Sequence, residues 1–418
     1  MLRKPVPYRR TVLFAVVLLS VLLAIAAAAF AAAGVEEAGN VQDASRIVYE
    51  VIQCENDRNW EGLLSLWTPE NRQDLRDFLK NNLSSKNNAG VLSVESANIV
   101  EIKELPSEVA NAFTNMDKYR EKYVRASLFY VGINYRVSHE TKYYFNGVNY
   151  RIAVVVSDGS RWYLAELSDA PVEAIVSDGH GFGSRSEKIA ERIAKARYKG
   201  LAVNVKGDVL ENFSATPEQL SQERGRRTVP PDAGVTADEH TRPSSIRVYL
   251  TNSTNYTYYG YKGPTARAID FYYYVKNVLP KEWISSWPAE SLKAGAMATK
   301  MYGWYHVYHP KWPSLNADVK DNTQDQVFLV KSELNPTTQA INAVGGIGME
   351  KASTHTLFEA QHWAGYYSDH GKSSGKMEHW GTKYWADSPR NKTYDWMCHY
   401  YYDSSPNTSY QLMAFFYY

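Results

Sequence analysis

The sequence contains very little cysteine and almost no net charge. Two of its 418 residues are cysteines, Cys54 and Cys398, and they lie far apart in the chain. No spacing argues for or against a disulfide between them, and we expect both side chains to act as small buried apolar groups. The 46 basic residues nearly balance the 45 acidic ones, with a formal net charge of +1. This balance gives no electrostatic argument for a nucleic-acid partner.

Patterns of metal ligands are also missing. No Cys/His motif is present, and the histidines at 362, 370 and 379 have no common ligand spacing. The sequence therefore predicts no metal ion and no cofactor. Aromatic residues, in contrast, are abundant, with 32 Tyr and 11 Trp. Their flat rings suit interfaces and the faces of sugars, and they equally suit a hydrophobic core.

The N-terminus carries a long apolar segment. Four basic residues in "MLRKPVPYRR" precede an uncharged run over 11–33. A secretory signal core has about 7 to 15 apolar residues and a membrane span about 20, so the length favours an uncleaved anchor. The Ala-x-Ala ending at Ala33 leaves cleavage open. We expect a single-pass protein of the bacterial cell membrane with extracytoplasmic domains, or a secreted protein if the segment is cleaved.

Composition and periodicity divide the chain into four parts. Residues 1–36 form the signal anchor or signal peptide, and residues 40–175 are expected to fold as helices followed by an antiparallel sheet. This order of elements resembles the cone-shaped α+β fold of the NTF2-like family. Residues 176–243 are predicted to be a basic helix, packed or lying on a membrane, and then a linker. Residues 244–418 form a second α+β domain.

The second domain contains a glutamate between two predicted helices. "AIDFYYYVKNVL" has helical spacing, and Pro280 is expected to end this helix, which places Glu282 in a loop. The helix that follows contains Gly295 and Gly303, each of which costs up to about 1 kcal/mol in a helix interior. We therefore expect another group to pack very closely against it.

Several segments of this domain resemble one known family. "DFYYYVKNVLPKEWISSWPAESLKAGAMATKMYGWY" is similar to the opening of the SpoIID/LytB domain, which is named for stage II sporulation protein D. The resemblance continues in order through "DNTQDQVF", "QAINAVGGIGM", "FEAQHWAGYYSDHG" and "SGKMEHWGTKYWADSPRNKTYDWMCHYYYDSS". It covers roughly residues 244–405. One departure is Glu378-His379, where many members have Ser-Gln.

The resemblance implies a lytic transglycosylase that cleaves the MurNAc–GlcNAc bonds of peptidoglycan and leaves 1,6-anhydro ends. The catalytic glutamate of the family corresponds to Glu282. One carboxyl group is sufficient for this chemistry, because the sugar's own 6-hydroxyl is the nucleophile. Trp283 and Trp287 offer an apolar wall that would raise the pKa of Glu282, whereas Lys281 and Lys293 would lower it, so the sequence leaves the direction open.

The resemblance also suggests residues that bind the glycan. These are Lys293 and Lys300 on one helical face, Gln326, Gln361 and Trp283. Each has an ordinary structural alternative, such as a lysine that extends from a packed helix or an amide that holds the backbone.

Two other functions remain open at this point. Part of the family is described as amidase enhancers, which would act on a cell-wall amidase without an acid of their own. The chain could also be a noncatalytic glycan-binding scaffold of the cell wall or of the sporulation machinery. The expected partners are glycan strands, the membrane through the N-terminal segment, and a cell-wall amidase or another envelope protein. The glutamate at 282 favours catalysis, because neither binding function requires an acid there.

Overall fold

The computed structural model describes residues 44–198, 200–213, 240–367 and 375–418. Two compact units divide the chain, Met1–Arg46 and Ile47–Tyr418. The predicted apolar segment 11–33 and most of the predicted linker lie outside the described residues. Within the described part, no helix combines the length and the apolar character needed to cross a membrane. The second unit is described below as an N-terminal region (47–213) and a C-terminal region (240–418).

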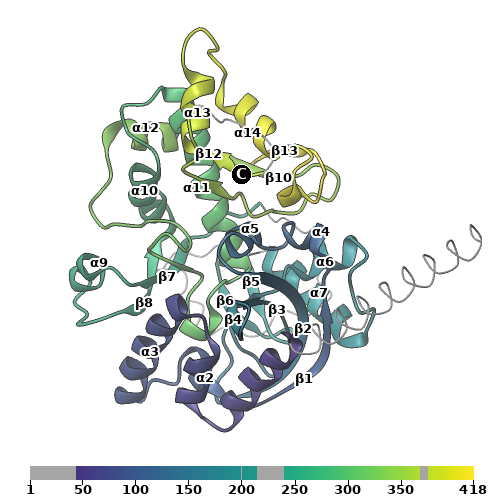
Figure 1. The fold of residues 1–418 in the computed structure, drawn as a ribbon. Coiled ribbons are helices and arrows are strands. Elements are labelled where there is room, and N and C mark those ends of the chain that lie inside the picture. The colour runs from purple at the N-terminus through teal and green to yellow at the C-terminus, as the bar shows by residue number, and fades with distance from the viewer. Residues whose placement is uncertain (1–43, 199, 214–239, 368–374) are drawn as a thin grey trace, which may run out of the picture. The chain divides into compact units, whose positions relative to one another are not determined.

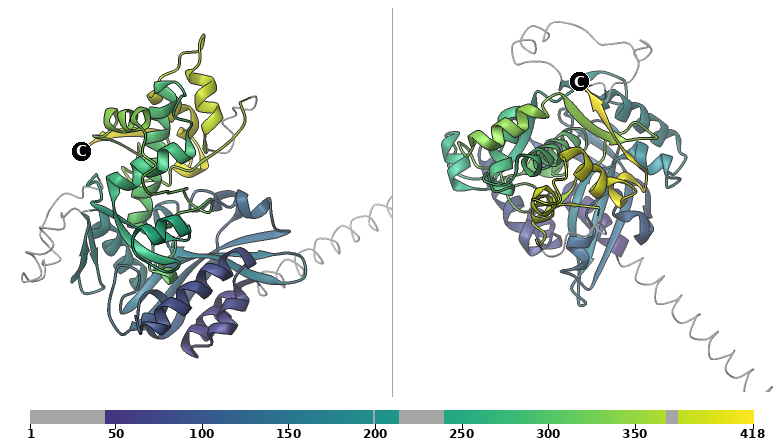
Figure 2. Two further views of the ribbon diagram at one scale, coloured as in Figure 1. Left: turned by 90° about the vertical axis from the view of Figure 1, so that its left-hand side faces the viewer. Right: turned by 90° about the horizontal axis from the view of Figure 1, so that it is seen from above.

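The N-terminal region begins with helices, as the sequence predicts. A helix that ends at residue 56 is followed by α2 (Trp60–Leu66) and α3 (Pro69–Ser84), which lie side by side in Figures 1 and 2. Pro69 suits the first position of α3 because the first turn of a helix leaves its N–H groups unpaired. The buried face of α3 includes Leu75 and Phe78.

The helices are followed by a four-stranded antiparallel sheet. Its strands pair in the order β1-β2-β3-β4, and β2, β3 and β4 form the predicted meander. Gly147 and Gly159 have φ angles of +106° and +97° at the two turns where the sequence has "FNG" and "SDGS". The strand bounds are β1 (Val94–Glu104), β2 (Arg125–Val137), β3 (Gly147–Ser157) and β4 (Trp162–Asp169).

Short helices and one longer helix accompany this sheet. The longer helix, α7 (Arg185–Tyr198), is the predicted basic helix, and Ala190, Ile193 and Ala194 are buried on it. It is therefore packed within the unit. The short helices are α4 (Ser107–Ala110), α5 (Asp117–Arg120) and α6 (Val172–Ser177). The predicted mixed α+β class with an antiparallel sheet is confirmed, and the NTF2-like resemblance stays a prediction.

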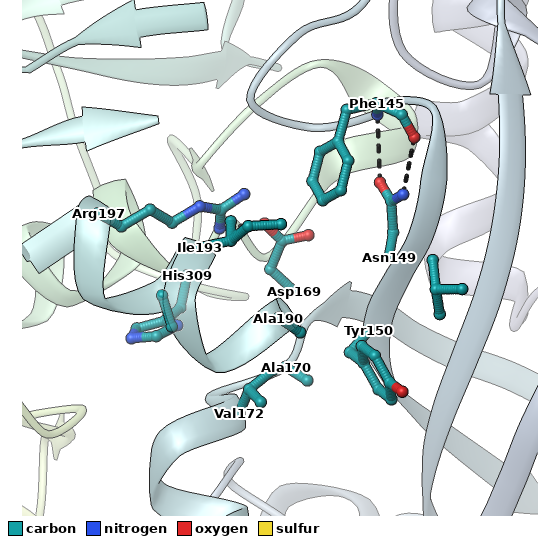
Figure 3. Close-up of a pocket in the computed structure, with 12 residues that line it drawn as sticks. Phe145, Asn149, Tyr150, Asp169, Ala170, Val172, Ala190, Ile193, Arg197 and His309 are labelled. Atoms are coloured by element: carbon teal, nitrogen blue, oxygen red, sulfur yellow. Dashed lines mark hydrogen bonds and ion pairs between the residues drawn. The ribbon is translucent and has the colours of Figure 1, made fainter. Parts of the chain in front are cut away.

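A small cavity lies between the sheet and α7 (Figure 3). Its volume is about 40 Å³, and Asp169, Arg197 and His309 contribute its polar lining together with Asn149. Asn149 is tied to the backbone of Phe145 by two hydrogen bonds of 2.8 and 3.2 Å. A cavity of this size holds one or two water molecules and is too small for a sugar ring.

The C-terminal region is organised around one long helix. Every residue of α11 (Ala289–Tyr308) from Ala294 to Tyr308 is buried. Its neighbours in Figure 1 are α10 (Phe271–Glu282), α12 (Asn335–Ala343), α13 (His379–Ala386) and α14 (Tyr394–Tyr402). A helix that is covered on all sides cannot be amphipathic, which explains why small and apolar residues occur all round it.

Short strands and turns complete the unit. In the C-terminal region, β7 pairs antiparallel with β8 and parallel with β9. The remaining strands and the short α-helix α9 are β5 (Leu201–Val203), β6 (Val209–Asn212), β7 (Ser245–Leu250), α9 (Ser253–Tyr258), β8 (Thr265–Asp270), β9 (Val319–Lys320), β10 (Ile347–Lys351), β11 (His362–Trp363), β12 (Met377–Glu378) and β13 (Met413–Tyr417).

The prediction that Pro280 ends a helix is wrong. α10 continues through Pro280 to Glu282, and the N–H of Trp283 donates to the carbonyl of Leu279 at 2.8 Å. Proline costs the helix one hydrogen bond, but its fixed φ angle is helical, so the last turn still closes after it. Glu282 is thus the last residue of a helix. A six-residue connection, 283–288, then leads to α11.

Candidate functional site

Glu282 occupies a largely buried position at the end of α10. Its side chain is 14 % exposed, and its Oε1 accepts a hydrogen bond of 2.7 Å from the backbone N–H of Val327. Burial raises the pKa of Glu282 to about 7, although the bond from Val327 acts in the opposite direction. The direction that the sequence left open is therefore upward, and the second carboxylate oxygen is not used by this hydrogen bond.

Two histidines lie beside this carboxylate. His362 is in β11 and His379 begins α13, and the parallel pairing of β11 with β12 brings them together. Nδ1 of His362 is 2.9 Å from Nε2 of His379. The same Nε2 is 3.9 Å from Oε2 of Glu282. Oxygen and nitrogen ligand atoms of all three side chains lie within 4.8 Å of one another, so this group could hold a metal ion.

Both imidazoles are neutral at pH 7. Burial lowers the pKa of His362 to about 3 and lowers the pKa of His379 well below its usual value. Desolvation disfavours the charged imidazolium, and no buried anion close to the pair offsets it enough to restore the pKa.

Trp283 forms a fixed wall of the site. Its ring centroid is 3.9 Å from that of His379, and its Nε1 donates to Thr382 Oγ1 at 2.9 Å. A Cβ atom on Gly295 would lie only 2.5 Å from the same ring. The glycine in α11 is therefore required by Trp283, which confirms the predicted close packing. Trp283 itself is 1 % exposed and lies within the core.

Gln326 joins the site through His362. Its Nε2 is 2.7 Å from Nε2 of His362 and donates to the Thr299 carbonyl at 3.3 Å. Its Oε1 accepts a 3.0 Å hydrogen bond from the hydroxyl of Tyr274. Of the predicted glycan-binding residues other than Trp283, Gln326 is thus part of the Glu282 group.

The structure places Lys293, Lys300 and Gln361 in other surroundings. Lys293 pairs with Glu290 at 2.7 Å. Lys300 is buried and donates to the carbonyls of Val344 and Ile347. Gln361 donates to a buried carboxylate at 2.5 Å. Among the described residues, no hydrogen bond or ion pair connects these three to Glu282. Their role in glycan binding stays a prediction.

Exposed aromatic rings flank the two histidines along the chain. Trp363 follows His362 and is 41 % exposed, and Trp380 follows His379 and is 36 % exposed. Tyr366 and Tyr367 are exposed by 66 % and 42 %. The four rings form what we call the aromatic rim, in which Trp363 lies 6.2 Å from Tyr366 and Trp380 lies 6.5 Å from Tyr367 between centroids.

Sequence reasoning identified Glu282 but did not group the two histidines with it. Positions 282, 362 and 379 have no helical or strand spacing in common, so only pairing of distant segments can join them. One signal was present, because Glu378-His379 departs from the Ser-Gln of the resembling family at that turn.

Comparison with known proteins supports the class of the C-terminal region. The model of the SpoIID family, described as Stage II sporulation protein, matches residues 262–349. The predicted resemblance to this family is confirmed. Residues 262–349 are therefore similar to a SpoIID domain, and this similarity suggests a protein related to sporulation or the cell wall. The match includes Glu282 and Gln326 and ends before His362.

One further similarity is local. An uncharacterized protein of Brachyspira hyodysenteriae is 42 % identical over 62 residues, which cover 15 % of this chain and 17 % of that protein. The chain therefore aligns with less than a fifth of this relative's length.

Proposed function

We propose that the protein is a lytic transglycosylase of the cell envelope that cleaves MurNAc–GlcNAc bonds in peptidoglycan, with Glu282 as its single acid and base. The observation that carries the proposal is the placement of Glu282 as one carboxyl group in a largely buried site, with Oε1 held by the N–H of Val327. Within the described residues, no hydrogen bond links this carboxyl group to another carboxylate.

The proposed reaction uses one oxygen of Glu282 twice. The protonated Oε2 donates its proton to the glycosidic oxygen as the bond to the anomeric carbon of MurNAc breaks. The resulting carboxylate then accepts the proton of the sugar's 6-hydroxyl, whose oxygen attacks the anomeric carbon and closes the 1,6-anhydro ring. The raised pKa of Glu282 agrees with this role, because a general acid must keep its proton near neutral pH.

The aromatic rim supports a glycan as the substrate. Aromatic rings bury large apolar area and can stack on the apolar faces of sugars. Trp363 and Trp380 are directly bonded in the chain to the two histidines beside Glu282, so a strand lying on the rim would run close to the proposed acid.

The experiment compares the full-length chain with its Glu282→Gln variant on purified glycan strands, with and without stem peptides. Mass spectrometry detects anhydro-terminated products. We expect loss of the general acid to reduce product release by about 10²- to 10⁴-fold. Glu290→Gln is the matched control, because it makes the same change at the first turn of α11, where Glu290 pairs with Lys293.

Release by the wild type and the control, but not by Glu282→Gln, supports catalysis. Equal release by wild type and Glu282→Gln, or release by neither, would contradict it. If neither protein releases product, stimulation of a purified cell-wall amidase by both the wild type and Glu282→Gln would favour an amidase enhancer. Glycan binding without such stimulation would favour a scaffold.

A further inference from the structure

Three side chains with the chemistry of transition-metal ligands converge at the end of α10. The residues are Glu282, His362 and His379, and the atoms that face one another are Oε2 of Glu282, Nδ1 of His362 and Nε2 of His379. In a tetrahedral zinc site with bonds of about 2.0 to 2.1 Å, neighbouring ligand atoms lie roughly 3.3 Å apart. The two imidazole nitrogens here are 2.9 Å apart, and the carboxylate oxygen is 3.9 Å from His379. These two distances are within about 0.6 Å of the tetrahedral value, and the third pair of ligand atoms lies within 4.8 Å.

We propose that Glu282, His362 and His379 bind one divalent transition-metal ion of the zinc type, with a fourth position open to water or to a substrate oxygen. Two imidazoles and one carboxylate form a ligand set suited to zinc, copper or nickel. Calcium and magnesium prefer sites built from oxygen ligands. Zinc is the ion that the tetrahedral geometry fits best.

One distance in the group argues for a bridging ion. Nε2 of His379 and Oε2 of Glu282 are too far apart, at 3.9 Å, for a hydrogen bond. The carboxylate is turned so that its Oε1 accepts from Val327 and its Oε2 faces the histidines. An ion between these atoms would bind this oxygen and would replace the 2.9 Å hydrogen bond between the two ring nitrogens.

The surrounding residues supply the outer support that metal ligands need. Histidine ligands usually donate their second ring N–H to a fixed acceptor. For His362 bound through Nδ1, the group beside its Nε2 is the side-chain amide of Gln326. In the structure the amide nitrogen faces this ring atom at 2.7 Å, so the amide would have to turn over to offer its oxygen as the acceptor. His379 is held by the ring of Trp283, and Thr382 Oγ1 donates to the His379 carbonyl at 2.7 Å.

Ion binding has a consequence for the reaction that rests on the proposed function. With an ion on Oε2, that oxygen can no longer carry the proton that the glycosidic oxygen needs. The ion-bound chain would therefore lack its general acid, and zinc would inhibit glycan cleavage reversibly. The site would then respond to the zinc concentration outside the cytoplasmic membrane.

Direct binding tests the site without any glycan. The full-length chain is purified without a histidine tag, stripped with a chelator and titrated with Zn²⁺ by calorimetry, and Co²⁺ absorption reports the coordination number. We expect one equivalent of Zn²⁺ and a four-coordinate Co²⁺ spectrum. Glu282→Gln, His362→Gln and His379→Gln should each weaken binding by about 10- to 100-fold or more. The control, His139→Gln, removes an exposed histidine elsewhere and should leave binding unchanged.

Two outcomes would overturn the site: no Zn²⁺ binding by the wild type, or binding that Glu282→Gln and His379→Gln leave intact. Circular dichroism confirms that each variant is folded, and Zn²⁺ should raise the melting temperature of the wild type and of His139→Gln more than that of the three ligand variants. Glycan cleavage by the metal-free chain with no Zn²⁺ binding would refute this inference and leave the proposed function standing. Zn²⁺ binding by a chain that cleaves no glycan in its metal-free state would support this inference and refute the proposed function.

Discussion

At Glu282, burial and one hydrogen bond act on the pKa in opposite directions, and burial has the larger effect. The N–H of Val327 stabilises the charged form, whereas the surrounding apolar groups exclude the water that would otherwise do so. The neighbouring lysines do not change this result. Lys281 is exposed at the helix end, and Lys293 is paired with Glu290. The pKa of Glu282 is therefore determined by the groups that surround it in space and not by its neighbours in sequence.

Lys300 provides a test of burial on a second ionisable residue. Burial lowers its pKa to about 7, from the usual value of 10.5. Between these two values the unfolded chain holds a proton that the folded chain has released, so the stability of the fold should rise with pH. The expected slope is about 1.4 kcal/mol per pH unit. Chemical denaturation of the wild type and of Lys300→Met from pH 7.5 to 9.5 measures it.

Lys300→Met removes the titrating group and leaves all others in place. As the pH rises, the free energy of unfolding of the wild type should therefore increase relative to that of the variant. The variant will be less stable overall, because the carbonyls of Val344 and Ile347 lose their donor. Parallel pH profiles for the two proteins would contradict the lowered pKa.

The helix α11 shows how one element supports the site. It is buried along most of its length, and Gly295 gives the ring of Trp283 the space to lie against it. The Trp283 ring in turn packs against the ring of His379. The close packing of Trp283 on α11 therefore helps to position His379. The cost in helix propensity at this glycine is offset by that packing.

Two glycines of α11 allow a matched test. A Cβ atom at Gly295 would lie 2.5 Å from the Trp283 ring, whereas one at Gly303 would meet Tyr274 at 3.2 Å. We expect Gly295→Ala to destabilise the protein by about 1 to 3 kcal/mol, because the ring is held by Thr382 and has little freedom to move. Gly303→Ala should stay within about 1 kcal/mol of the wild type, because alanine favours the helix.

Urea denaturation measures both variants, and glycan cleavage is assayed beside it. Gly295→Ala should also lose activity, because displacing Trp283 disturbs the chain next to Glu282. Equal stabilities for the two variants would show that the Trp283 ring can give way.

At the scale of the whole unit, buried polar contacts connect the N-terminal and C-terminal regions. Asp318 accepts hydrogen bonds from Lys142 Nζ at 3.2 Å, from the Tyr143 hydroxyl at 2.9 Å and from the N–H of Arg247 at 2.8 Å. Lys320 pairs with Asp74 at 2.8 Å. The predicted separation into domains at 176–243 stays a prediction. The contacts join residues that precede this segment to residues that follow it.

Removing Asp318 should destabilise the whole unit. Asp318→Ala leaves Lys142, whose side chain is 3 % exposed, without its buried carboxylate partner, and we expect a loss of about 3 to 5 kcal/mol. The control is Glu95→Ala, which breaks an exposed pair with Arg136 and should cost at most about 1 kcal/mol.

Denaturation monitored by two probes tests whether the N-terminal and C-terminal regions unfold together. Eight of the 11 tryptophans follow residue 280, so tryptophan fluorescence reports mainly on the C-terminal region, whereas circular dichroism reports on both regions. Coincident transitions are expected in the wild type. Separate transitions, or equal effects of Asp318→Ala and Glu95→Ala, would argue that the regions are independent.

The sequence by itself determined the elements and the proposed acid. Alternating residues and turn glycines predicted the meander, and helical spacing predicted α10 and α11, because these patterns depend on neighbours along the chain. Family-like segments singled out Glu282. The end of α10 was predicted wrongly, since a local rule for proline cannot register the hydrogen bond that closes the last turn.

Only the tertiary structure decided what surrounds Glu282. The pairing of β11 with β12 brings His362 and His379 together, and the fold then places both beside the end of α10. It also turned Lys300 and Gln361 inward to structural partners. Desolvation and ligand geometry depend on which distant segments meet in space, and no periodicity along the chain encodes that meeting.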